Sequence, residues 1–278
     1  MRMRCYVNIL WRMADRGLGR VLPPRQLAAY AAIRAWYIGE PELRLAKFLC
    51  DRRSISIDVG AAEGTYTYFL RNYSKACYSF EPNPDFAARL TRVFGRGVIV
   101  EACAVSDQTG TATLTIPVVD GVAYAGWGTI EPGRLFEGHV TRTVSVQTRR
   151  LDEFDFKGVG FIKIDVEGHE MPVLRGAMAL LDRESPSFLI EAEERHKPGT
   201  VQKVSAFLGQ RGYRGFFLLD RKLHPIQAFD PEVHQKVENG RKLLSKVVSR
   251  VYINNFLFLK DPAVIDRMSK LFAYRDTA

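Results

Sequence analysis

The amino-acid sequence predicts an α/β protein built on a mostly parallel β-sheet. From Ser54 onward, short β-rich runs alternate with stretches of helical character, which is the order typical of parallel strands joined by helices. The β-rich runs are apolar along most of their length, as expected for strands that helices cover on both faces. A chain of 278 residues suits one large domain or one domain with an appendage.

The residues before Ser54 are expected to form an N-terminal helical extension. Pro23 and Pro24 precede an Ala-rich apolar run, PPRQLAAYAAIRAWYIG, and the segment PELRLAKFL continues the helical pattern. We therefore expect three parts: a helical extension at 1–50, an α/β domain at 51–262 and a C-terminal tail at 263–278.

The strands and helices of the α/β domain follow one another in a regular order. Strands are expected in SISIDV, CYSFE, GVIVEACAV, GFIKIDV and SFLIEAE, and later in YRGFFLLD and VYINNFLFLK. Helices are expected between the first five, in GTYTYFLRN, PDFAARLTRVF and EMPVLRGAMALLDRE. This pattern places the carboxyl ends of the parallel strands, where such sheets bind ligands, at one edge of the sheet.

One segment interrupts the alternation of strands and helices. TATLTIP and TRTVSVQTRRL read as paired strands around the Gly-rich loop VVDGVAYAGWGTIEPGRLFEG, which contains Trp127. A loop this long is uncommon as a passive connector. It is therefore either a lid over a substrate or an irregular surface excursion.

Charge and sequence motifs bear on the possible partners of the protein. The formal net charge is +9, and much of the excess lies near the two ends, at Arg2, Arg4, Arg12, Arg16, Arg20 and Arg25 and at Lys236, Arg241, Lys242, Lys246 and Arg250. These residues form either solvated helix faces or a weak contact with an anionic membrane surface or a polyanionic substrate. Zinc-finger spacing and aromatic RNA-binding signatures are absent, so we expect no nucleic-acid partner.

Localisation is expected to be cytoplasmic. No apolar run reaches the roughly 18 residues that a membrane span needs, and the N-terminus lacks the pattern of a signal peptide. Four scattered cysteines, Cys5, Cys50, Cys77 and Cys103, read as reduced thiols rather than a disulfide framework or a zinc site.

The first strand ends in a glycine loop, IDVGAAEG. Asp58 lies at the end of the strand, and Gly60 and Gly64 follow it. Glycines allow the backbone to turn sharply and to approach a ligand closely, and the next helix directs free N–H groups at the same place. The spacing is GxxxG rather than the dinucleotide pattern GxGxxG. A tight strand-to-helix turn without a ligand remains the alternative.

The second strand ends in an acid, Glu81. A carboxylate in this position can accept hydrogen bonds from both hydroxyls of a ribose, so the glycine loop and Glu81 together indicate a nucleoside site. The sequence lacks phosphate-binding motifs. The nucleoside most consistent with the pair is therefore S-adenosylmethionine, which has a ribose and no phosphate.

Four motifs carry a resemblance to a known family. IDVGAAEGTYT, FEPNP, ACAVSD and FIKIDVEGHE, in this order, resemble the FkbM family of S-adenosylmethionine-dependent methyltransferases. The resemblance covers roughly residues 40–260 and includes INNFLFL as the last strand of the family. The family usually has Asn where this chain has Glu63.

The resemblance implies a class I methyltransferase fold, Rossmann-like, with a seven-stranded sheet, and a set of cofactor residues. Asp58, Gly60, Ala61 and Gly64 would line the methionine part of S-adenosylmethionine, with Tyr66 and Thr67 nearby. Glu81 would hold the ribose, and Pro82 and Asn83 would shape the adenosine pocket. The adenine would lie beside Ala104, Val105, Ser106 and Asp107, and Asp165 would lie near the amino group or the reacting methyl.

Methyl transfer to a hydroxyl needs a group that takes its proton. The candidates are Asp165, His169 and His196. His169 either acts as this base or caps and packs at the start of the next helix, and His196 lies either over the pocket or in a charged surface loop. Asp165, Glu191 and Glu193 follow neighbouring strands and suit a divalent metal, but polar strand ends explain them equally well, so we assign no metal.

The expected activity is S-adenosylmethionine-dependent O-methylation of a hydroxyl on a sugar, a polysaccharide or a secondary metabolite. The expected partner is accordingly a small-molecule or glycan acceptor, and the oligomeric state is left open. An NAD-dependent oxidoreductase and a non-catalytic cofactor-binding module are the alternatives. The missing GxGxxG counts against the first, and the retention of Asp58, Glu81 and Asp165 counts against the second.

Overall fold

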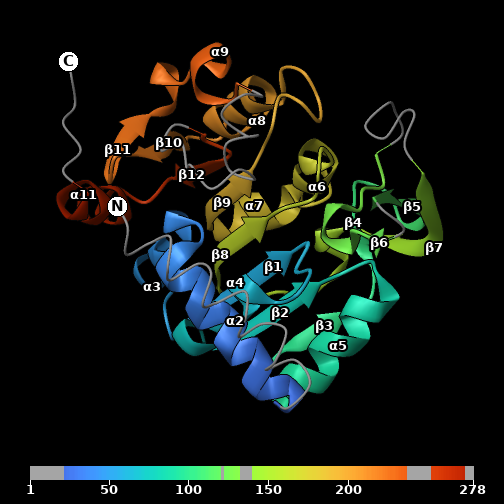
Figure 1. Cartoon of the computed structure of the whole chain (residues 1–278). Coiled ribbons are helices and arrows are strands. Elements are labelled where there is room, and N and C mark those ends of the chain that lie inside the picture. The colour runs from blue at the N-terminus through green and yellow to red at the C-terminus, as the bar shows by residue number, and fades with distance from the viewer. Residues whose placement is uncertain (1–21, 120–121, 132–139, 237–251, 273–278) are drawn as a thin grey trace, which may run out of the picture.

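The computed structural model describes residues 22–119, 122–131, 140–236 and 252–272. A central eight-stranded sheet has the order β11-β10-β12-β9-β8-β1-β2-β3 (Figure 1). Its strands are β1 (Ile55–Val59), β2 (Ala76–Phe80), β3 (Ile99–Glu101), β8 (Val159–Ile164), β9 (Ser187–Glu191), β10 (Arg214–Leu219), β11 (Lys222–Pro225) and β12 (Asn255–Leu259). The five strands from β3 to β9 pair in parallel, whereas β12 is antiparallel to β9 and β10. The predicted α/β class and mostly parallel sheet are confirmed.

The expected number of seven strands is wrong by one, because β11 adds an antiparallel hairpin at the edge. Residues Asp220 and Arg221 join β10 to β11, and both have positive φ, 49° and 65°. Positive φ at both central residues is the geometry of a tight two-residue hairpin turn, which Asn-Gly or Asp-Gly usually supplies. The dipeptide Asp-Arg is not one of these usual turn sequences, so the hairpin could not be predicted from the sequence pattern.

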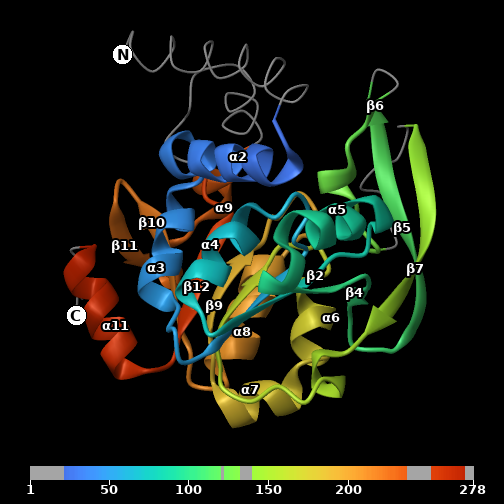
Figure 2. The same ribbon diagram turned by 90° about the horizontal axis from the view of Figure 1, so that it is seen from below.

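Helices cover both faces of the central sheet (Figure 2). On one face lie α2 (Pro24–Ile38), α3 (Ala46–Leu49), α4 (Thr65–Tyr73), α5 (Pro84–Phe94) and α11 (Pro262–Leu271). On the other face lie α6 (Glu170–Arg175), α7 (Met178–Glu184) and α8 (Thr200–Gly209), and a short helix, α9 (Pro231–His234), precedes β12. Each face has its own apolar core, with Phe161 and Leu189 on the first and Ile162 and Ile164 on the second, which explains why the strands are apolar throughout.

A second, smaller sheet stands beside the first, and Figure 2 shows its long strands at the edge of the molecule. It has the order β4-β7-β5-β6, with β4 (Ala104–Val105), β5 (Gly110–Val119), β6 (Val122–Ala123) and β7 (Thr141–Arg149). The expected pairing of TATLTIP with TRTVSVQTRRL is confirmed, because Gly110 to Pro117 pair antiparallel with Thr148 to Thr141. The run GVIVEACAV, expected as one strand, splits into β3 and β4, and β4 pairs with β7 instead of β2.

The segment EMPVLRGAMALLDRE forms two helices, α6 and α7, and not the single helix expected. Gly176 lies between them, and a Cβ atom at this position would lie 1.9 Å from the carbonyl oxygen of Ser106. The helical segment therefore breaks where it contacts the chain after β4, a tertiary contact that helical periodicity does not reveal.

The N-terminal and C-terminal segments share the core of the α/β domain. Ala28, Leu43 and Leu45 of the extension are buried against the α4 face, and Met268 of α11 is fully buried there. The described part of the extension is helical, with a 3₁₀ turn η1 (Pro41–Leu45) between α2 and α3. Residues 1–21, with most of the basic residues of that end, and the basic residues of 237–251 lie outside the described parts.

Within the described ranges, no helix is long and apolar enough to cross a membrane. Cys50, Cys77 and Cys103 are free thiols, and Cys5 lies outside these ranges.

A buried acid in the extension makes stability depend on pH. Glu42 is 6% exposed, and burial raises the pKa of its carboxyl from 4.5 to about 8. The folded state holds this proton more tightly than the unfolded chain does. The resulting contribution to the free energy of unfolding is therefore fully present below pH 4.5 and is lost as the pH rises through 8. We expect Glu42→Gln, which cannot ionise, to be more stable than the wild type by roughly 1–3 kcal/mol at pH 9.

Urea unfolding of Glu42→Gln and of the wild type from pH 4.5 to pH 9 measures this effect. The advantage of the variant should grow steadily over that range. The control is Asp155→Asn, because the Asp155 side chain is 84% exposed and its loss should give no such trend. An equal advantage of Glu42→Gln at all pH values would contradict the prediction.

Candidate functional site

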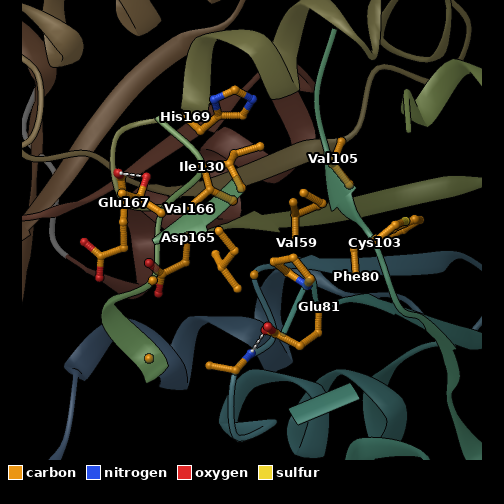
Figure 3. Close-up of a pocket in the computed structure, with 18 residues that line it drawn as sticks. Val59, Phe80, Glu81, Cys103, Val105, Ile130, Asp165, Val166, Glu167 and His169 are labelled. Carbon is orange, nitrogen blue, oxygen red and sulfur yellow. Dashed lines mark hydrogen bonds between the residues drawn. The ribbon is translucent and has the colours of Figure 1, made fainter. Parts of the chain in front are cut away.

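A pocket lies at the carboxyl ends of β1, β2 and β8, beneath the smaller sheet (Figure 3). Space not filled by atoms amounts to about 560 Å³, solvent at the mouth included. One wall comes from the three strand ends, a second from the β3–β4 connection and β5, and a third from the segment 126–130. Seven residues expected from the sequence line it: Gly60, Glu81, Pro82, Ala104, Val105, Asp165 and His169.

The glycine loop contacts both neighbouring elements closely. Gly60 has φ +80°, and a Cβ atom there would lie 1.8 Å from the carbonyl oxygen of Asp165. Gly64 has φ +85°, and its Cβ would lie 2.6 Å from side-chain carbons of Leu90 and Phe94 on α5. The packing of the protein itself therefore requires both glycines, Gly60 at the end of β8 and Gly64 against α5. Only Gly60 also lines the pocket.

Glu81 connects the glycine loop to the segment after the second strand through two hydrogen bonds. Its Oε2 accepts a hydrogen bond of 2.7 Å from the backbone N–H of Ala62, and its Oε1 accepts one of 2.8 Å from Asn83. The residue is 5% exposed, and burial raises the pKa of the carboxyl to about 7, although these two bonds act in the opposite direction. No cation of the described chain forms an ion pair with Glu81. Hydroxyl groups of a ligand are suitable further donors to this carboxylate.

Several predicted cofactor residues lie behind the pocket wall rather than on it. Asp58 is buried and accepts a 2.6 Å hydrogen bond from the hydroxyl of Thr67, which also bonds Ser79. Burial raises the pKa of Asp58 to about 6. Tyr66 donates from its hydroxyl to Glu40. These side chains support the loop from below.

The remaining cofactor candidates have structural partners of their own. Ala61 packs in the apolar core of the α4 face. Asn83 caps α5, because its side chain accepts a bond from the N–H of Asp85. Asp107 pairs with Arg175 near the surface, at 2.8 Å. These side chains do not line the pocket, and their role in cofactor binding stays a prediction.

Asp165 and Glu167 place two carboxyl groups on the pocket wall, at the end of β8. The Asp165 side chain is 32% exposed and lies 3.6 Å from the ammonium of Lys163. Glu167 approaches the ring of His196, with 3.1 Å between Oε2 and Nε2. Burial raises the pKa of Glu167 to about 8 and lowers that of His196 to about 4, so burial disfavours the charged form of both groups.

The two histidines occupy different positions. The His196 side chain is 6% exposed, so the interpretation as a surface residue is wrong, yet it lies behind Glu167 and not on the pocket wall. His169 lines the pocket and stands at the N-cap position of α6, but its side chain makes no capping bond. Its Nδ1 lies 2.5 Å from Oε1 of Glu131, and its Nε2 lies 2.9 Å from Oγ of Ser106. Both ring nitrogens of His169 are therefore occupied.

The described part of the long loop forms the third wall of the pocket. Gly126, Gly128, Thr129 and Ile130 line it, and Thr129 donates from its hydroxyl to the carbonyl oxygen of Glu167. Lys197 holds the second oxygen of Glu131 at 2.9 Å. The described part of the loop is thus fixed at the pocket, and the lid stays a prediction. Residues 132–138 and His139 of the loop lie outside the described ranges.

The acids considered for a metal have other partners. Glu191 accepts a bond from Asn254, and Glu193 accepts bonds from Arg195 and Tyr252. Across the described residues, no three side chains of His, Cys, Asp or Glu gather in a metal-binding group.

Sequence reasoning missed the residues that depend on tertiary contacts. Glu131 in the loop and the apolar wall of Phe80, Cys103, Leu114 and Ile130 are examples. Lys163 was also missed, although a lysine within a strand expected to be buried was a usable signal.

A parallel sheet with one antiparallel strand, β12, inserted near one edge is the class I methyltransferase fold. The comparisons then identify the family. The model of the methyltransferase FkbM domain matches residues 58–214, more than half of the chain, and the chain belongs to this family. No curated protein matches it.

Solved structures similar to this chain include an FkbM methyltransferase from Methylobacillus flagellatus, with 16% identity and a TM-score of 0.45. The match covers 91% of this chain and 60% of that one, so the chain spans less than two thirds of that protein. An O-methyltransferase from Bacillus cereus, in complex with SAH, has 11% identity and a TM-score of 0.43, with coverage of 88% and 96%. At these similarities neither structure transfers a substrate or a residue role.

Proposed function

We propose that this protein is an S-adenosylmethionine-dependent methyltransferase that binds its cofactor in the pocket at the ends of β1, β2 and β8. The observation that carries the proposal is that Gly60 and Glu81 line one pocket, because a glycine bend and a carboxylate that face a common pocket can hold a nucleoside. The apolar surfaces of Phe80, Val105 and Leu114 on the same pocket suit an adenine ring. The cofactor supplies a methyl group on a sulfonium, ready for in-line displacement.

In this proposal, different residues bind different parts of the cofactor. Glu81 accepts hydrogen bonds from the ribose hydroxyls, and Pro82, Ala104 and Val105 enclose the adenosine. Asp58, Ala61, Gly64, Tyr66, Thr67 and Asn83 act from behind the wall by fixing the loop, as do Ser106 and Asp107 beside the adenine. Gly60 and Asp165 face the methionine end. Positioning is the main contribution expected from such a site.

We propose Asp165 as the group that takes the proton of a hydroxyl acceptor. It is partly exposed on the pocket wall, so its carboxylate is available to a ligand. His169 has both ring nitrogens occupied, which favours a role in holding the loop. His196 lies behind Glu167 and has no direct access to the pocket.

The acceptor proposed is a hydroxyl of a sugar, a polysaccharide or a secondary metabolite, in the cytoplasm. The family membership supports the methyltransferase reaction, and the carboxylate of Asp165 supports an oxygen acceptor, whose proton must be removed. A weak membrane-surface contact through the basic ends stays part of the proposal, although most of those residues lie outside the described ranges.

Calorimetric titration tests the proposal. S-adenosylmethionine and S-adenosylhomocysteine should bind the folded protein, whereas NAD should not. A folded sample that binds neither nucleoside would refute it, and binding of NAD would favour the oxidoreductase. Transfer of a labelled methyl group to any acceptor separates an enzyme from a non-catalytic binding module.

A further inference from the structure

A lysine is fully buried beneath the methionine end of the proposed site. Lys163 on β8 is 0% exposed, next to the strand end that carries Asp165. Burying an ammonium group is costly unless charges and hydrogen bonds compensate it. The Nζ atom bonds the carbonyl oxygen of Ile164 at 3.3 Å and Oδ1 of Asn255 at 3.2 Å, and it lies over the ring of Tyr66, 5.0 Å from the centroid.

Carboxylates from several neighbouring elements act on this lysine. Burial alone lowers the pKa of Lys163, but four carboxylates outweigh it and leave the pKa raised: Asp165 at the end of β8, Glu191 on β9, Glu40 before η1 and Asp58 on β1. Burial raises the pKa values of Asp58 and Glu191 in turn. Figure 1 shows β1, β8, β9 and β12 side by side in the middle of the sheet. Lys163 is therefore the cation of a polar layer that crosses four strands.

Among these carboxylates, Asp165 is the one that reaches the pocket wall. Its Oδ2 lies 3.6 Å from Nζ of Lys163, and Figure 3 shows its side chain at the pocket. Its negative charge raises the pKa values of several other acids nearby: Glu40, Asp58, Glu81, Glu167, Glu170 and Glu191. The buried ammonium of Lys163 attracts the Asp165 carboxylate and fixes the direction of its side chain.

The N-terminal extension completes this arrangement. Oε2 of Glu40 accepts hydrogen bonds from the hydroxyl of Tyr66 at 3.0 Å and from Nδ2 of Asn255 at 3.4 Å. Asn255 uses its other atom, Oδ1, to hold Lys163. Glu40 lies outside the range 58–214 of the family match, so a segment beyond the matched domain orients the groups that hold Lys163.

We propose that Lys163 is a positioning residue of the methyl-transfer site, which holds the Asp165 carboxylate directed at the cationic end of S-adenosylmethionine. This inference rests on the proposed function. Lys163 itself touches no ligand, because it is fully buried, and it acts through Asp165. The layer of Glu40, Tyr66 and Asn255 fixes Lys163 in turn.

A double-mutant cycle tests the inference by S-adenosylmethionine binding at pH 7. We expect Lys163→Met and Asp165→Asn each to weaken binding about tenfold, and the double variant to bind no more weakly than Asp165→Asn alone. S-adenosylhomocysteine, which lacks the sulfonium charge, should lose less affinity in each variant. A purely structural lysine would instead give losses that multiply in the double variant and that are equal for both ligands.

Controls separate folding from positioning. Lys157→Met removes an exposed lysine, 79% exposed, and should change neither melting temperature nor affinity. If Lys163→Met does not fold, the variant Lys163→Met/Glu191→Gln takes its place in the cycle. This variant removes one positive and one negative charge together. Wild-type affinity in that variant would overturn the inference. Failure of the wild type to bind S-adenosylmethionine would instead refute the proposed function.

Discussion

Replacing Glu81 with alanine is expected to weaken S-adenosylmethionine binding roughly 100-fold or more, because hydrogen bonds to a charged group contribute about 1.5–3 kcal/mol each. The carboxylate lies on the pocket wall, is 5% exposed and has no cationic partner within the described chain. Two ribose hydroxyls would donate to it. The alanine removes both acceptors and also leaves the N–H groups of Ala62 and Asn83 without their partner.

Isothermal titration of Glu81→Ala and Glu63→Ala measures the effect against a matched control. Glu63 belongs to the same loop, but its side chain is 57% exposed and pairs only with Arg89, at 3.2 Å. An exposed pair of this kind contributes little, so Glu63→Ala should keep wild-type affinity within about twofold. Equal affinities of Glu81→Ala and the wild type would remove the ribose assignment.

The pH dependence of binding follows from the same carboxyl. Because burial raises the pKa of Glu81 to about 7, part of the ligand-free protein carries a proton there at neutral pH. Hydroxyl donors prefer the ionised form, so S-adenosylmethionine should bind more weakly as the pH falls below 7 and should release a proton on binding. In Glu81→Gln the proton release should disappear.

Local patterns in the sequence were sufficient for most of the fold. Apolar runs such as GFIKIDV and SFLIEAE became buried parallel strands, because burial on both faces imposes that composition. The errors arose where distant segments meet. Gly176 breaks a helix because it contacts Ser106, and Asp220 and Arg221 form a hairpin without the usual turn residues.

The candidate site was predictable at its strand ends and not elsewhere. Gly60, Glu81 and Asp165 follow β1, β2 and β8, and parallel pairing necessarily brings such ends together. Glu131 reaches His169 from 38 residues away in the chain, a contact that depends on how the smaller sheet packs. The buried position of Asp58 depends likewise on the hydroxyl of Thr67 in α4.

Replacing Gly60 with alanine is expected to destabilise the protein by roughly 4 kcal/mol or more, among the largest effects of a single substitution. Two causes combine. The residue has φ +80°, and the new methyl group would lie 1.8 Å from the carbonyl oxygen of Asp165. That oxygen belongs to the backbone at the end of β8, which is paired with β1, so it cannot move aside without separating the two strands.

Gly158→Ala separates the backbone strain of Gly60→Ala from its clash, because Gly158 has φ +79° and nothing within 4 Å of the place that a Cβ atom would occupy. Gly158→Ala should lower the free energy of unfolding by only about 1–2 kcal/mol, which is the strain of a left-handed conformation alone. Chemical unfolding of both variants gives the difference. If the two losses are equal, the contact between the glycine bend and the end of β8 is not what requires glycine at position 60. The folded fraction of Gly60→Ala can also be tested for S-adenosylmethionine binding. If only Gly60→Ala loses much stability, and its folded fraction does not bind S-adenosylmethionine, then this contact determines the shape of the pocket as well as the stability of the sheet.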